Sequence, residues 1–108
     1  MSPFIKKYAI SRVDGTGDSF TPILTPIFEV PEGKTYVLMT TEISSKSNSL
    51  VYLKQFDADG VERFSVKYDM EKNDYVVFTH KLVFSQFEKF AVYADSADVQ
   101  IAAHIIEG

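Results

Sequence analysis

The sequence predicts an antiparallel β-sandwich, jelly-roll-like and of about eight strands, in a single domain over residues 1–108. Short apolar runs alternate with turn residues about every 8–12 positions, which is typical of sandwiches and barrels. Phe, Tyr, Val and Ile dominate these runs, and such side chains suit pleated surfaces. No window of a dozen residues keeps the helical spacing i, i+3, i+4, i+7 without interruption. A chain of this size can bury one core without disulfides.

The N-terminal half is expected to form four strands, at residues 4–13, 23–30, 35–44 and 50–56. The first ends at the glycine-containing turn 14–18. Pro22 and Pro26 place the second strand at a sheet edge or at a bulge, because proline cannot donate to a ladder. A turn at 31–33 follows. In the third strand, strict alternation would put Val37, Met39 and Ile43 on one face.

The C-terminal half is expected to form strands at 61–68, 75–84, 89–94 and 99–106. The sequence Asp57-Ala58-Asp59-Gly60 joins the fourth and fifth strands as the clearest hairpin in the chain. In the fifth strand Phe64, Val66 and Tyr68 alternate with Arg63, Ser65 and Lys67, which indicates one buried and one wet face. The run 75–84 reads as one strand with Val76, Phe78, His80, Leu82 and Phe84 on one side.

Composition narrows the class of function. The formal charge of −4 opposes sequence-independent binding to nucleic acid, and Lys6-Lys7 is the only adjacent basic pair. The absence of Cys excludes disulfides, thiolate metal sites and cysteine nucleophiles. The start of the chain does not resemble a signal peptide, and no apolar run is long enough to span a bilayer. The chain is expected to be made as a soluble cytosolic protein with no membrane contact.

The best metal candidate is the run 57–62, in which Asp57, Asp59 and Glu62 could supply oxygen ligands around Gly60. The positions that follow lack the further ligands of a calcium loop, so a plain hairpin turn is the favoured interpretation.

No motif predicts an enzyme. His80 and His104 are the only histidines, and neither has an acidic residue two positions away that would share its face. The Gly15-Thr16-Gly17 run lacks the third glycine and the helix of a dinucleotide site. No GxSxG sequence supplies a nucleophile elbow. We therefore expect no catalytic residue, no metal and no cofactor.

Two strands are apolar on both faces. The sequences YVLM at 36–39 and YVVF at 75–78 exceed what one buried face of a sandwich needs, so their outer faces are expected to meet another surface. Strand parity also suggests that Tyr36, Tyr52 and Tyr93 point outward, where they could serve an interface. These features favour a binding or assembly module over a catalyst.

The segments VPEGKTYVLMTTEIS (30–44) and FEKFAVYADSADVQIAAHIIEG (87–108) resemble small virion proteins of tailed bacteriophages. In that family a V-P-x-G-K-T turn leads into a strand, and a late G-(E/D)-K-(L/I)-x-V-x-(S/A)-x-(S/A)-x-x-V segment precedes the last strand. Phe87 stands where the family usually has glycine. The matching residues are Val30, Pro31, Gly33, Lys34, Thr35, Glu88, Lys89, Phe90, Val92, Ala94, Ser96, Ala97 and Val99.

This resemblance implies a non-enzymatic structural protein of the virion, in first place a capsid decoration protein that binds the major capsid protein as a homo-oligomer such as a trimer. A neck or tail protein, contacting other virion proteins, and a receptor- or carbohydrate-binding module are the alternatives. A short N-terminal arm, residues 1–7, is expected to reach a neighbour. The expected partner-binding residues are Phe4, Ile5, Lys6, Lys7, Tyr36 and Tyr52.

Overall fold

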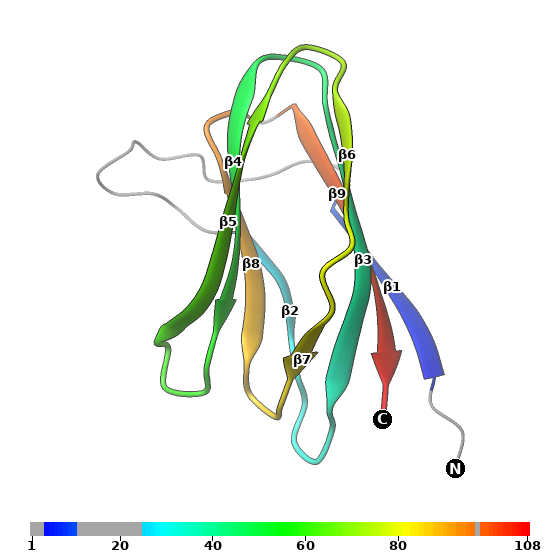
Figure 1. Ribbon diagram of the computed structural model, residues 1–108. Coiled ribbons are helices and arrows are strands. Elements are labelled where there is room, and N and C mark those ends of the chain that lie inside the picture. The colour runs from blue at the N-terminus through cyan, green and yellow to red at the C-terminus, as the bar shows by residue number, and fades with distance from the viewer. Residues whose placement is uncertain (1–3, 11–24, 97) are drawn as a thin grey trace.

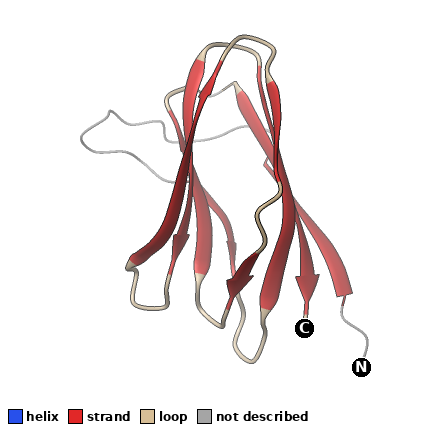
Figure 2. Ribbon diagram, in the orientation of Figure 1, coloured by secondary structure: helices blue, strands red, loops and turns tan. Residues whose placement is uncertain are grey.

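The computed structural model describes residues 4–10, 25–96 and 98–108, with the backbone alone for 4–10 and Thr25. In these ranges the chain forms strands and loops without a helix (Figures 1 and 2). The strands are β1 (Phe4–Ile10), β2 (Thr25–Glu29), β3 (Tyr36–Ser45), β4 (Ser49–Phe56), β5 (Glu62–Met70), β6 (Tyr75–Phe78), β7 (Leu82–Phe84), β8 (Lys89–Ala94) and β9 (Val99–Glu107).

The strands form two antiparallel sheets that pack face to face, so the predicted β-sandwich is confirmed (Figure 1). Sheet A has the order β1-β9-β3-β6, with β7 also paired to β3, and sheet B has the order β2-β8-β4-β5. The pairings are nested along the chain: β4 with β5, β3 with β6 and β7, β2 with β8, and β1 with β9. The domain is thus one long hairpin, and its successive strand pairs belong alternately to sheet B and to sheet A.

Several local predictions are confirmed. The β4–β5 hairpin closes over residues 57–61, where Gly60 has a φ of 82° and its N–H donates to the carbonyl of Asp57 at 3.0 Å. The turn at 31–33 closes with Lys34 N–H donating to the Pro31 carbonyl at 3.2 Å. Strand β2 lies at an edge of sheet B and carries a bulge after Pro26, as proline predicts. The predicted turn 14–18 lies outside the described residues.

The run 75–84 is not the single strand that its pattern predicts. Phe78 pairs with Thr41 of β3, but Leu82 pairs with Leu38, so three residues of this run (79–81) face only two of β3. The mismatch breaks the run into β6 and β7. His80 falls in the break and is exposed, with its ring stacked on Phe64 at a centroid distance of 5.7 Å.

The face assigned to β3 by strict alternation is also wrong. A bulge in the β3–β9 ladder inserts Met39 between Leu38 and Thr40. Because an inserted residue reverses the parity of a strand, Leu38 and Ile43 both face the core while Val37 and Met39 are only half-buried. Tyr36 therefore points inward, and its side chain is 1% exposed.

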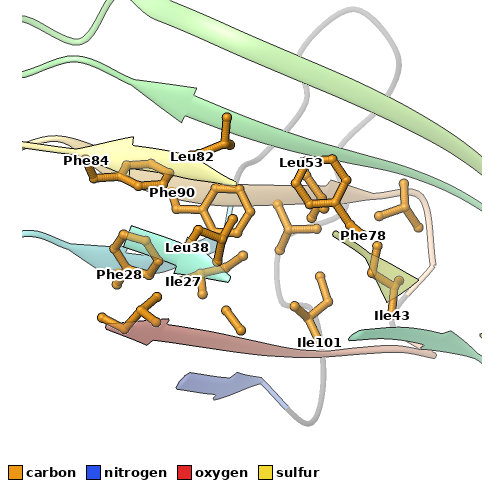
Figure 3. Packing of buried hydrophobic residues seen from close by; sticks show 14 of the residues in the cluster. Ile27, Phe28, Leu38, Ile43, Leu53, Phe78, Leu82, Phe84, Phe90 and Ile101 are labelled. Atoms are coloured by element: carbon orange, nitrogen blue, oxygen red, sulfur yellow. The ribbon is translucent and has the colours of Figure 1, made fainter. Parts of the chain in front are cut away.

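The core fills the space between the sheets (Figure 3). At one end Phe28, Phe84 and Phe90 pack with ring centroids 5.0–5.5 Å apart, in edge-to-face and tilted geometries that aromatic pairs favour. Aliphatic side chains such as Leu38 of sheet A and Leu53 of sheet B are fully buried beside them. On β5, Phe64, Val66 and Tyr68 complete this core as predicted, while Ser65 and Lys67 are exposed.

Candidate partner-binding face

The outer face of sheet A carries a transverse row of apolar side chains. Val37 of β3 lies opposite Val83 of β7 on one side and opposite Ile106 of β9 on the other. Val83 is 60% exposed, and Val37 and Ile106 are half-buried. Directly opposed residues of antiparallel strands project to the same face, so these side chains form one continuous strip. In the adjoining strand β1, the backbone of Ile5 is in register with Ile106.

A second row crosses the same face further along the strands. Val77 of β6 lies opposite Glu42 of β3, and Glu42 lies opposite Ala102 of β9. Val77 is 43% exposed, and Tyr75, two residues earlier on β6, is 60% exposed. We call the outer face formed by Val37, Tyr75, Val77, Val83 and Ile106 the apolar face of sheet A.

Glu42 links two neighbouring side chains on this face. The hydroxyl of Tyr75 donates to Oε1 of Glu42 at 2.8 Å, and Nε2 of His104 lies 3.1 Å from Oε2 of the same carboxylate. Hydrogen bonding to the carboxylate, with smaller effects of burial and of its charge, raises the pKa of Tyr75. The cluster joins β6, β3 and β9 and places directional contacts amid the apolar side chains of this face.

The outer face of sheet B is different because ion pairs lie on it beside the aromatic pair of Tyr52 and Tyr93. Ion pairs join Lys54 to Glu62 and Arg63 to Asp57, the latter at 3.0 Å. Two more exposed pairs lie at wider separations: Lys89 with Glu29 at 3.6 Å and Lys67 with Asp69 at 4.0 Å.

Most of the residues predicted to bind a partner are placed differently from expectation. Residues Phe4 to Lys7 form the first half of β1 and pair with β9, so they are part of sheet A and not a free arm. Tyr36 is in the core because of the β3 bulge and cannot touch a partner. Tyr52 lies on the outer face of sheet B, half-buried, with Lys54 Nζ 5.4 Å from its ring centroid. Tyr93 is outward too, but only 4% exposed and packed on Tyr52 at 6.0 Å.

The apolar face of sheet A was signalled in part by the sequence. The two-sided apolar character of YVLM and YVVF predicted that the outer faces of these strands carry apolar side chains, and Val37, Tyr75 and Val77 lie there. Within 36–39, however, the side chain expected outside was that of Tyr36, which is buried. The contribution of Val83 and Ile106 was missed, because it depends on the register that aligns β7 and β9 with β3.

Asp57 is committed to the hairpin turn. Its Oδ1 accepts the N–H groups of Asp59 and Val61, each at 2.9 Å, and its Oδ2 accepts from Arg63 Nε at 3.0 Å. The hydrogen bond from Val61 leads the contributions that lower the pKa of this carboxyl below 3.8, against an opposing effect of burial. The turn interpretation of residues 57–62 is therefore confirmed. In the ranges 4–10, 25–96 and 98–108, no group of three or more His, Asp or Glu could hold a metal ion.

Within the part of the chain that the structure describes, no helix is long and apolar enough to cross a membrane. No protein-family model matches the chain, and no curated protein matches it significantly.

Proposed function

We propose that this chain is a non-enzymatic structural protein of a tailed-phage virion, and that it is a capsid decoration protein that binds the capsid surface as an oligomer. The observation that carries the proposal is the apolar face of sheet A, on which Val83 and Tyr75 are each 60% exposed. An exposed apolar surface on a rigid sheet is typical of a docking site for another protein. The major capsid protein is the proposed partner.

The turn that departs from the family pattern supports the proposal. Phe87 has a φ of 67°, in the left-handed region that glycine adopts without strain. The family's usual glycine would therefore fit the backbone of this turn. The turn is tied to the first motif, because Phe87 N–H donates to the Val30 carbonyl at 2.8 Å and Val30 N–H donates to the Glu88 carbonyl at 3.0 Å.

The nested strand pairing also supports it. A long antiparallel hairpin rolled into two sheets is the plan of a jelly roll, a fold used in viral shells, and we propose that this sandwich is one. Such a domain offers a flat, stiff face whose side chains are fixed by the ladder below them. Binding through that face orders few additional groups, which limits the entropy lost on docking.

A neck or tail location would use the same face against another virion protein. A carbohydrate-binding module is the second candidate, and one observation favours it: the exposed ring of Tyr75, held by its hydrogen bond to Glu42, could stack on a sugar. Loss of glycan-array binding in Tyr75→Ala would support this candidate.

The first experiment is the copy number of the protein in purified particles, by quantitative mass spectrometry. A number close to that of the major capsid protein supports a decoration protein, and a much smaller number supports a neck or tail location. Absence from particles would overturn the structural role and favour the carbohydrate-binding candidate.

The binding face is tested with a matched pair of variants. Val83→Lys places a charge on the apolar face of sheet A, and Val61→Lys places the same charge on the hairpin turn, where Val61 is 58% exposed. We expect Val83→Lys to weaken binding to undecorated capsids by roughly tenfold or more and Val61→Lys to leave it unchanged. Equal binding by both variants would contradict the assignment of this face.

A further inference from the structure

Strand β5 forms an edge of sheet B. It runs from Glu62 to Met70 and, among the strands that the structure describes, pairs only with β4. It contains no proline, and its one irregularity lies near its start, between the pairs Gln55–Phe64 and Phe56–Glu62. A long, regular edge is a template for pairing with another strand.

The backbone groups that face this edge can be identified from β4. The N–H of Leu50 donates to Oδ1 of Asp95, and the carbonyl of Leu50 accepts from the N–H of Asp95. The backbone groups of Leu50 therefore point toward β8. Successive residues of a strand direct these groups to opposite sides, so those of Val51 and Leu53 point toward β5. Their partners Tyr68 and Val66 point back toward β4. The N–H and carbonyl groups of Ser65, Lys67 and Asp69 therefore face outward from the sheet edge.

We propose that two copies of this chain associate through β5, in antiparallel register, with Val66 of one copy opposite Val66 of the other. This register places Ser65 opposite Lys67 of the second copy, and Lys67 opposite Ser65. Their outward backbone groups then form the hydrogen-bonded pairs of a regular ladder. On the core-facing side, Phe64 meets Tyr68 of the second copy.

Charge complementarity selects this register and this occupant. Arg63 falls opposite Asp69 of the second copy, twice by symmetry. The side chain of Asp69 is 81% exposed and that of Arg63 is 63% exposed. Arg63 uses Nε for Asp57, which leaves its two terminal nitrogens for the second copy's carboxylate. A shift of the axis to Lys67 would oppose two lysines, and a shift to Ser65 would oppose Arg63 to Lys67, so neighbouring registers are disfavoured.

A two-fold axis normal to the sheet keeps the core-facing sides of both copies on the same side. The two four-stranded sheets would then form one continuous sheet of eight strands. This association leaves the apolar face of sheet A uncovered, and it does not depend on the proposed role in a virion.

Two charge reversals test the pairing. Arg63→Asp puts an acidic residue at both positions of the 63–69 pair, and Asp69→Arg puts a basic residue at both, so each variant alone repels its own copy at this pair. We expect each to weaken self-association by roughly tenfold or more, measured by sedimentation equilibrium. An equimolar mixture of the two should associate as well as the natural chain, because both symmetric contacts again join opposite charges. Failure of the mixture to associate would overturn the proposal.

The backbone is tested at Ser65. Ser65→Pro removes an edge-facing N–H that β4 does not use, and Ser65→Ala retains it. We expect the proline variant to be monomeric and the alanine variant to associate normally, with thermal melts confirming that both are folded. A natural chain that stays monomeric at millimolar concentration, or a dimer insensitive to Ser65→Pro and to both charge reversals, would overturn the assignment of β5 as the interface.

Discussion

The outer faces of the two sheets differ although their inner faces are alike. Both sheets send large apolar side chains into one shared core. Outside, sheet B bears ion pairs such as Lys54–Glu62 and Lys89–Glu29, whereas the apolar face of sheet A presents Val37, Val77 and Val83. A sandwich needs only its inner faces to fold, so the outer faces are free to vary. This difference is the reason that we propose the apolar face of sheet A, and not the outer face of sheet B, as the surface that binds a partner.

This comparison assumes that the inner faces of the two sheets contribute equally to stability. A matched pair of truncations tests that assumption. Leu38 of sheet A and Leu53 of sheet B are both 0% exposed. We expect Leu38→Ala and Leu53→Ala each to lower the free energy of unfolding by about 2–5 kcal/mol, through lost apolar burial and the cavity left behind. Urea unfolding followed by circular dichroism measures both. If the free energy of unfolding fell by less than about 1 kcal/mol for one of the two variants, its sheet would contribute little to the core.

The charged side of the molecule should be the more sensitive to acid. Because the folded-state pKa of Asp57 lies below its unfolded value of 3.8, its contribution to stability is present above pH 3.8. That contribution is lost as the pH falls through the lower, folded-state pKa. We expect Asp57→Ala to melt at a lower temperature than the natural chain at neutral pH and the two melting temperatures to converge in strong acid. A gap that stays constant with pH would contradict the role given to the carboxylate.

The inner side of sheet A also carries a buried polar group, which distinguishes it from the apolar side chains around it. Thr41 follows the β3 bulge and is 0% exposed, and its hydroxyl has no hydrogen-bond partner among the residues that the structure describes. Thr41→Val keeps the shape and removes this group, so we expect a gain of about 1 kcal/mol in the free energy of unfolding. The same urea titration applies, with Thr40→Val on the half-buried side as a control. A loss of stability in Thr41→Val would mean that the hydroxyl is satisfied.

Local pattern was enough to predict the sandwich, the β4–β5 hairpin and the two faces of β5, because each depends on residues close in sequence. The same pattern failed at Tyr36 and at His80. Both errors arise from one extra residue in a ladder, and an insertion of that kind is defined by the partner strand. For the candidate site, the apolar excess at 75–78 was visible in the sequence. The alignment of Val83 with Val37 and Ile106 was not, because it joins strands from distant parts of the chain.

The nested pairing has a mechanical consequence. Phe4 lies opposite Glu107, so the two ends of the fold leave the same end of sheet A. Tension applied between these ends would load the β1–β9 hydrogen bonds one after another, as in opening a zip, and not all together. A protein built this way resists weakly when pulled by its ends. It withstands load well only when it is held through the faces or edges of its sheets.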